Sequence, residues 1–235
     1  MEVCRKENLG AHFFFPFISS HIMVVIPENR TLHSDNLEHV AETLSTTERH
    51  IIGCVNWPEA FPEKPQASFQ MAHNGTELFI RFTVEEAGTL AAIREDNGEV
   101  WTDSCVEFFI ALDDTGYYNF EFTCIGKALL GFRKERPHAV HAAPEIMQSI
   151  KRLSSLGKEN FEEKSLGQPW TLTVAIPASA LFKHDIRQWK GLTAQANLYK
   201  CGDKLSTPHY LSWAPIDTEK PNFHVPRCFI PITFS

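Results

Sequence analysis

The sequence predicts an all-β fold, a β-sandwich of two antiparallel sheets with one or two short helices. Three observations predict it. Apolar residues recur at every second position in many short segments, turn residues separate those segments, and helical periodicity is scarce. The 235 residues contain no internal repeat and no linker rich in glycine, serine or proline. We therefore expect an irregular extension over residues 1–22 and a single sandwich domain over residues 23–235.

The elements follow in order along the chain. A first strand is expected near residues 22–26, a short helix over 36–44 and a second, weaker helix over 143–156. Five further segments alternate apolar and polar residues, as a strand with one buried face does: 77–84, 105–112, 117–124, 170–176 and 192–199. On their apolar faces we expect a core that contains Phe82, Phe108, Ile110, Phe120, Phe122, Leu172 and Val174.

The N-terminal stretch 11–26 is apolar and follows two basic residues, as in an export signal. Acidic residues flank the basic pair, histidines and a proline interrupt the apolar run, and no A-x-A cleavage site follows it. The run is also too short and too broken for a membrane span. A cytoplasmic protein is the default expectation, and a secreted or periplasmic one is the alternative.

Charge narrows the classes of partner. The formal net charge is -7 and the isoelectric point is about 5.9, whereas a nucleic-acid partner usually needs a basic face. The same acidic balance disfavours anionic membrane surfaces. We expect neither nucleic acid nor membrane as a partner, and a neutral small ligand is compatible with the charge.

The hairpin WTDSCVEFFIALDDTGYYNFEF (101–122) carries one glutamate on each strand, within an otherwise apolar and aromatic run. Because side chains alternate along a strand, both glutamates lie on the polar face together with amides and hydroxyls of this hairpin and of segment 192–199. That face has scarcely any lysine or arginine. The alternative is an ordinary solvated sheet face. The residues concerned are Glu107, Asn119, Glu121, Thr123, Gln195 and Asn197.

Large aromatic residues lie in the loops that adjoin this face: Trp101, Trp213 and Phe223. A pyranose ring has a patch of C–H groups that stacks on an aromatic ring, while its hydroxyls need directional donors and acceptors. Aromatic rings beside carboxylates and amides therefore indicate a sugar-binding surface.

Four stretches resemble a family 9 carbohydrate-binding module, in particular the stand-alone family-9-like proteins of glycan-foraging bacteria. They are NWPEAFPEKPQASF (56–69), VWTDSCVEFFIALDDTGYYNFEFTCIG (100–126), IP (176–177) and ANLYKCGDKLSTPHYLSWAPIDTEKPNFHVPRCF (196–229). Together they span most of residues 52–234. The resemblance implies a β-sandwich that binds a mono- or oligosaccharide without cleaving it, often in association with a glycosidase that degrades polysaccharides. Characterised members hold the reducing end of a saccharide between two aromatic rings.

Carried over by position, the resemblance gives Trp101 as the first ring, Glu107 as its acidic partner, and Gln195 and Asn197 as the amide-rich strand. Three positions depart from the family pattern. Phe223 stands where members have a second tryptophan, Glu121 where they have an arginine, and Thr123 where related sequences favour asparagine. The reversed charge at Glu121 means that we transfer sugar binding in general and no named sugar.

Three alternatives stay open. Glu107 and Glu121 could be the paired carboxylates of a glycosidase, which lie roughly 5–5.5 or 6.5–9.5 Å apart. Haem would need axial donors such as Met71, His209 or His224. The third alternative is a sandwich that binds another protein.

Cysteines and acidic turn residues give no firm metal site. Strand parity places Cys105 and Cys124 on opposite faces of the hairpin, which disfavours a disulfide between them. The cluster Cys201, His209, His224 and Cys228 has no zinc spacing, so we expect buried, reduced thiols and no metal there. Asp113 and Asp114 in the turn DDTG could ligate a structural calcium ion, but aspartate and glycine are also ordinary turn residues. No other cofactor is expected.

Overall fold

The structure is a computed structural model, and it describes residues 23–235. The predicted extension over residues 1–22 lies outside the described residues. The larger sheet has nine strands: β1 (Val24–Ile26), β3 (Cys54–Val55), β7 (Cys105–Asp113), β8 (Gly116–Thr123), β9 (Ala128–Arg133), β10 (Val140–His141), β14 (Thr193–Cys201), β15 (Tyr210–Ser212) and β16 (Ile230–Phe234). The main order is β1-β16-β14-β7-β8-β9-β10, with β15 added beside β14 and β3 beside β15.

The second sheet has five strands in the order β11-β13-β5-β4-β2. They are β2 (His50–Ile51), β4 (Gln66–His73), β5 (Glu77–Glu85), β11 (Lys151–Ser154) and β13 (Trp170–Pro177). A third, two-stranded sheet pairs β6 (Thr89–Ala91) with β12 (Phe161–Lys164). The predicted β-sandwich is confirmed, and the small third sheet is an addition to it.

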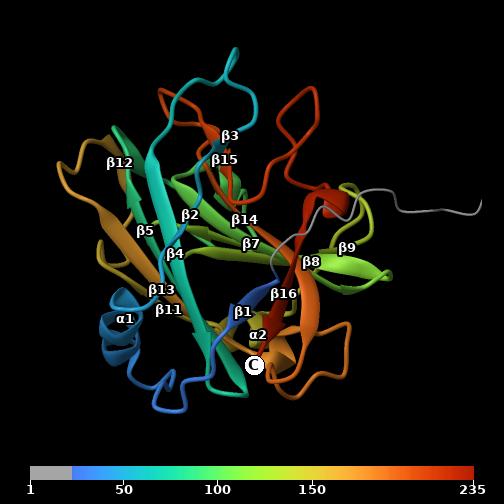
Figure 1. Cartoon of the computed structure of the whole chain (residues 1–235). Coiled ribbons are helices and arrows are strands. Elements are labelled where there is room, and N and C mark those ends of the chain that lie inside the picture. Colours follow the sequence, from blue (N-terminus) through green and yellow to red (C-terminus); the bar gives the residue numbers. More distant parts are fainter. Residues whose placement is uncertain (1–22) are drawn as a thin grey trace, which may run out of the picture.

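The sandwich core lies between the two large sheets, which Figure 1 shows as two layers with β4, β5 and β13 in one and β7, β8 and β14 in the other. All seven residues predicted for this core have no exposed surface. They form one apolar cluster, because the alternation of each strand turns these side chains toward the facing sheet. The sequence prediction of the inner faces is confirmed.

One strand pair departs from the antiparallel expectation. β1 runs parallel to β16, with Val24 beside Ile232 and Ile26 beside Phe234. The backbone N–H of Ser235 donates to the carbonyl of Ile26 at 3.1 Å. The described chain therefore begins and ends at the same edge of the larger sheet.

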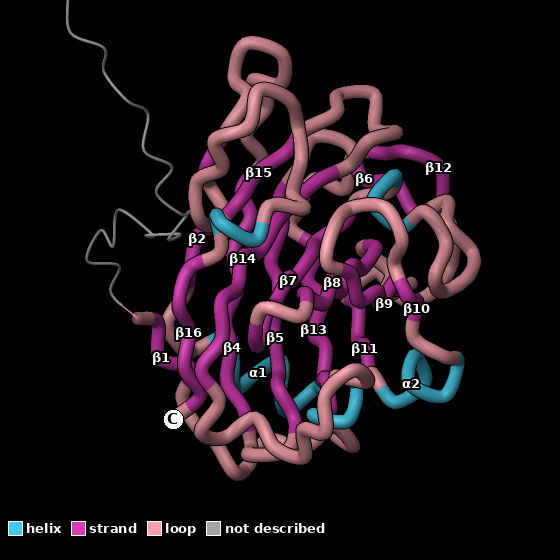
Figure 2. Tube along the Cα trace, turned by 90° about the vertical axis from the view of Figure 1, so that its right-hand side faces the viewer, coloured by secondary structure: helices cyan, strands magenta, loops and turns pink. Residues whose placement is uncertain are grey.

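The sandwich has two α-helices beside its sheets, α1 (Leu37–Ser45) and α2 (Pro144–Ser149). Figure 1 shows α1 beside the second sheet, and Figure 2 shows α2 below β10. The side chain of Asn36 caps α1 by accepting from the backbone N–H of His39 at 3.0 Å. Leu37, Val40 and Leu44 bury the apolar face of α1 on the outer face of the second sheet. None of the helices in residues 23–235 is long and apolar enough to span a membrane.

The second helix is shorter than the predicted 143–156. Ile150 takes an extended conformation at the C-cap of α2, and the following residues form β11. Arg152 then pairs with Val174 of β13. Without β11, the backbone groups of β13 on that side would have no partner. Completing the sheet edge therefore competes with helix formation, and the sequence pattern did not reveal this. Three single 3-10 turns complete the elements: η1 (Val100–Thr102), η2 (Ala178–Ala180) and η3 (Pro226–Cys228).

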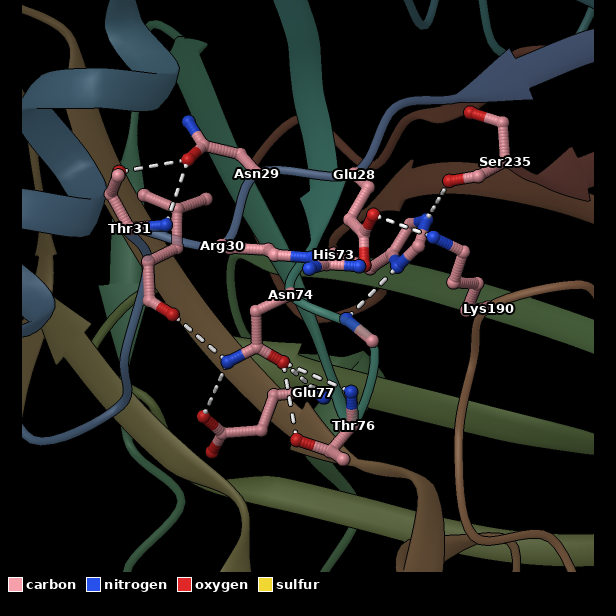
Figure 3. A network of polar contacts seen from close by, with 12 residues as sticks. Glu28, Asn29, Arg30, Thr31, His73, Asn74, Thr76, Glu77, Lys190 and Ser235 are labelled. Carbon is pink, nitrogen blue, oxygen red and sulfur yellow. Dashed lines mark hydrogen bonds and ion pairs between the residues drawn. The ribbon is translucent and has the colours of Figure 1, made fainter.

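A network of polar contacts joins four segments of the chain near the turn between β4 and β5 (Figure 3). The side-chain oxygen of Asn74 accepts from the backbone N–H of Glu77 at 2.8 Å, and its amide donates to the carbonyl of Leu32 at 2.9 Å. His73 Nε2 lies 3.0 Å from the carbonyl oxygen of Ser235. This network fixes the segment before α1 and the C-terminal residue to the second sheet.

Candidate functional site

The outer face of β7, β8 and β14 is covered, although the sequence pattern allowed an ordinary solvated face. Residues of the loops 56–61 and 213–229 pack on it and form a second apolar cluster with the sheet. The indole N–H of Trp57 donates to the carbonyl of Thr218 at 2.6 Å and ties the two loops together. The amide of Asn197 holds Ala214 by donating to its carbonyl at 3.1 Å and accepting from its N–H at 2.9 Å.

Beside these loops the same face retains a cavity of about 530 Å³. A volume of this size is within the range of small-molecule sites. A larger hollow of about 770 Å³ lies near Glu86 and His209, but no Phe, Tyr or Trp lines it, so we place the candidate site in the smaller cavity. The wall of that cavity includes Trp101, Glu107, Glu121, Arg133, Arg136, Asp203, Tyr210, Phe223 and His224.

Glu107 and Glu121 form the polar part of the wall nearest the sheet. They are direct partners in the β7–β8 register, and each is only 3% exposed. Glu107 Oε1 accepts from the thiol of Cys201 at 3.1 Å, and Glu121 Oε1 accepts from the amide of Asn119 at 2.8 Å. The second oxygen of Glu121 has no hydrogen-bond partner within residues 23–235. A buried oxygen without a partner gains from a new hydrogen bond.

The buried environment favours the protonated form of both carboxyl groups. Burial raises the pKa of Glu121 to about 7, although the Asn119 amide and the Arg133 guanidinium oppose this rise. Burial also raises the pKa of Glu107 well above its ordinary value, and the neighbouring Cys201 and Glu121 add to the effect. A protonated carboxyl group both donates and accepts hydrogen bonds. The pair therefore suits hydroxyl groups, which do the same.

The guanidinium group of Arg133 is linked to Glu121 by hydrogen bonds through Asn119. Arg133 Nε donates to the side-chain oxygen of Asn119 at 3.0 Å, and Arg133 Nη1 donates to the carbonyl of Arg136 at 2.7 Å. Gly131 lies between them on β9, and a Cβ there would come within 2.8 Å of the Asn119 oxygen. The absence of a side chain at this position therefore permits the hydrogen-bonded sequence Glu121–Asn119–Arg133.

Aromatic rings supply the apolar part of the wall. Trp101 is half-buried in η1, and its carbonyl accepts from the backbone N–H of Asp203 at 3.2 Å. Phe223 stacks on Tyr199 with ring centroids 4.2 Å apart and an interplanar angle of 9°. The hydroxyl of Tyr199 donates to the carbonyl of Phe223 at 3.2 Å. The sheet thus holds the ring of Phe223, and the turn after β14 holds the backbone of Trp101.

Sequence reasoning missed several residues of the cavity wall. Arg133 belongs to β9, where it shares the outer face with Leu129 and Gly131, but the nearly uniform apolar run of this strand hides that face in the sequence. Asp203 and His224 come from loops without a period-2 pattern. Burial lowers the pKa of His224 to about 3, helped by nearby arginines, and its Nδ1 lies 2.9 Å from the hydroxyl of Tyr117.

The structure brings Trp101, Glu107, Glu121 and Phe223 to the cavity, but it does not bring all the predicted site residues there. Asn119 lies behind the wall and reaches it only through its partners. The remaining four positions have other surroundings. Gln195 is exposed toward the far end of β14, Asn197 holds the loop at Ala214, Thr123 accepts from the N–H of Lys127 in the next turn, and Trp213 packs on Phe69 at the edge of the sandwich core.

The other candidate ligand groups from the sequence are also separated. Cys201 lies beside Glu107, whereas His209 contacts Lys200 and Cys228 contacts Asp217. Met71 belongs to the sandwich core. Cys105 lies in the outer cluster and Cys124 in the inner one, as strand parity predicted. In the DDTG turn, Asp113 accepts from the backbone and hydroxyl of Thr115, so this carboxylate already serves the turn.

A comparison with protein families matches residues 37–234 to Carbohydrate-binding family 9. The chain belongs to this family. Carbohydrate binding, the function expected from the resemblance of the sequence, is therefore the function of this family 9 protein. A search of curated proteins finds no match.

Solved structures agree with the assignment to family 9. A candidate carbohydrate-binding protein from Bacteroides uniformis is similar at 38% identity and a TM-score of 0.81, over 91% of this chain and 97% of that chain. A family 9 module from Caldicellulosiruptor kristjanssonii in complex with glucose is similar at 10% identity and a TM-score of 0.52, over 91% and 96%. A family 9 module from the same organism in complex with cellotriose is similar at 11% identity and a TM-score of 0.53, over 91% of this chain and 93% of that chain. The two module complexes support the fold.

Proposed function

We propose that this family 9 protein holds a mono- or short oligosaccharide, without cleaving it, in the cavity between Trp101, Phe223 and the Glu107–Glu121 pair. The observation that carries the proposal is the pairing of fixed aromatic rings with two buried carboxyl groups on one cavity wall. The rings suit the C–H face of a pyranose, and the carboxyl groups suit its hydroxyls.

The expected affinity is modest. A monosaccharide has about 12 heavy atoms, and roughly 0.3–0.5 kcal/mol per atom gives about 4–6 kcal/mol of binding free energy. This corresponds to dissociation constants between about a millimolar and tens of micromolar. The unpartnered oxygen of Glu121 supports a directional contact within that energy, because a buried polar atom gains most from a new partner.

Two tryptophans allow a matched test by calorimetry against a panel of neutral saccharides. Trp101 and Trp213 are both half-buried, but only Trp101 lines the cavity. Glucose and cellotriose head the panel, because the structures of the Caldicellulosiruptor modules are complexes with them. Trp101→Ala should abolish measurable binding, and Trp213→Ala should keep it, with circular dichroism confirming that both variants are folded. Loss of binding in Trp213→Ala alone would place the site elsewhere.

A reducing-sugar release assay on the same panel tests the absence of catalysis. A retaining glycosidase needs one ionised carboxylate as nucleophile, whereas burial raises the pKa values of both Glu107 and Glu121. We expect saturable binding without product. Product release that disappears in Glu107→Gln would make the pair catalytic.

The proposal extends to a partner glycosidase and to a role in polysaccharide breakdown. A non-catalytic module raises the local concentration of substrate near an enzyme through a second binding event. The experiment is co-purification of the full chain with glycosidases of its own organism. No enrichment over a control with Trp101→Ala would argue for a role without such a partner.

A further inference from the structure

Two cysteines and one glutamate meet beneath the cavity. Cys105 of β7 and Cys201 of β14 are direct partners across the strands, and Glu107 lies on the same face of β7 two residues further on. The two sulfur atoms and a carboxylate oxygen of Glu107 all lie within 4.8 Å of one another. All three side chains are buried, and only Glu107 reaches the cavity wall.

We propose that Cys105, Glu107 and Cys201 bind one thiophilic divalent cation, such as zinc, at the floor of the cavity. Zinc bonds to thiolate sulfur at about 2.3 Å and to carboxylate oxygen at about 2.0–2.2 Å, which spaces tetrahedral ligand atoms about 3.5–4 Å apart. Cys201 Sγ and Glu107 Oε1 are 3.1 Å apart, so small side-chain movements suffice to admit the ion. Two sulfur ligands also favour zinc over magnesium or calcium.

The charge around Glu107 supports the site independently of the distances. Within residues 23–235, no nitrogen of Lys, Arg or His lies within 4.0 Å of this buried carboxyl group. A buried carboxyl group without a cation must either keep its proton or acquire a positive partner. A divalent ion supplies that partner and replaces the protons of Glu107 and the two thiols.

Three protein ligands leave one coordination position. Because Glu107 is the ligand on the cavity wall, that position opens toward the cavity and can take water or a hydroxyl group of a bound molecule. A molecule bound in the cavity could therefore become a ligand of the metal ion. The metal site itself does not require the sugar proposal to hold.

The test uses the full chain, reduced and freed of metal with a chelator, and titrated with Co²⁺ in the absence of sugar. One equivalent should produce the visible ligand-field bands of tetrahedral cobalt together with a thiolate-to-cobalt charge-transfer band. Cys105→Ser and Cys201→Ser, which each keep one thiolate, should lose about half of the charge-transfer intensity and weaken Co²⁺ binding at least tenfold. Cys124→Ser is the matched control, because Cys124 is equally buried but on the inner face, and it should behave as the wild type.

The wild-type titration decides the proposal even if a serine variant fails to fold. Saturation at one equivalent with both kinds of band supports the site, and addition of Zn²⁺ should displace cobalt and erase the bands. Absence of a charge-transfer band in the reduced wild type, or its persistence at full intensity in folded Cys105→Ser and Cys201→Ser, would overturn it. Sugar calorimetry in the presence of chelator keeps failure of the metal site distinct from failure of sugar binding.

Discussion

At the scale of single residues, the tryptophans divide into core and site. Trp170 begins β13, has no exposed surface and donates its indole N–H to Glu86 at 2.8 Å. We expect Trp170→Ala to lose about 3–5 kcal/mol of unfolding free energy, because truncating a core aromatic leaves a cavity. Trp101→Ala removes a half-buried ring and should stay folded with a much smaller loss. Urea denaturation measures both values, and equal losses would contradict this division.

Glu121 and Gln195 provide a second comparison between residues of the same sheet face. Glu121 lines the cavity and Gln195 is exposed away from its wall. Glu121→Ala should weaken sugar binding by about 1–3 kcal/mol, because a buried hydroxyl of the ligand loses its partner. Gln195→Ala should leave the affinity unchanged. Calorimetry with the tightest sugar of the panel checks this, and an equal effect of both substitutions would argue for a site spread along β14.

The two glutamates of the cavity could be predicted from the sequence, because strict alternation in one hairpin determines which side chains share a face. The same rule placed Gln195 and Asn197 on that face, but it could not place them along the strand relative to the loops. Asn197 lies under Ala214, which only the path of the 213–229 loop reveals. Parity therefore predicts the face, and the covering loops decide which part of it stays open.

At the scale of elements, β9 connects the hairpin to the arginines. Gly131→Ala would place a Cβ within 2.8 Å of the Asn119 oxygen and 3.1 Å of Arg133 Nη2. We expect the side-chain contact between Asn119 and Arg133 to break and sugar affinity to fall several-fold, while the strand pairing remains. Calorimetry and a thermal melt measure the two effects. Gly157→Ala, a control in a turn, should leave binding intact; unchanged affinity in Gly131→Ala would remove Arg133 from the site.

Element prediction failed where two structures competed for the same residues. Residues 151–154 were assigned to a helix, but β13 offers them a strand partner, and backbone pairing across the sheet outweighs a weak helical pattern. β9 was not recognised because its residues ALLGFR are apolar at nearly every position and show little alternation. Segments in which apolar and polar residues alternate were found, and this nearly uniform apolar segment was not.

At the scale of the whole molecule, the buried residue His209 makes the stability of the fold depend on pH. Burial and the neighbouring Lys200 lower the pKa of His209 to about 3, while an unfolded chain titrates near 6.5. The unfolded state then binds more protons below pH 6.5, so stability is complete above this pH and falls as the pH drops toward 3. The loss approaches about 1.4 kcal/mol per pH unit for one histidine.

Comparison of variants isolates this contribution from other titrating groups. The melting temperature of His209→Gln should fall less steeply than that of the wild type between pH 6.5 and 4.5, whatever its value at pH 7.5. His39→Gln, at an exposed position of α1, should follow the wild type. Parallel curves for His209→Gln and the wild type would mean that His209 titrates in the folded protein as it does in the unfolded chain.

The parallel pairing of β1 with β16 has a practical consequence for how the protein can be attached to a surface. Val24 and Ser235 lie at one sheet edge, and β9, which ends at Arg133, is five strand spacings from β1, roughly 24 Å at about 4.8 Å per spacing. None of the cavity-lining residues in the described chain belongs to β1 or β16. A sensor chip that captures the C-terminus should therefore leave the cavity facing the flowing solution, whereas coupling through a cysteine introduced at Lys134 should obstruct it. For the same reason, an enzyme fused by design at the C-terminus should leave the cavity accessible to its ligand.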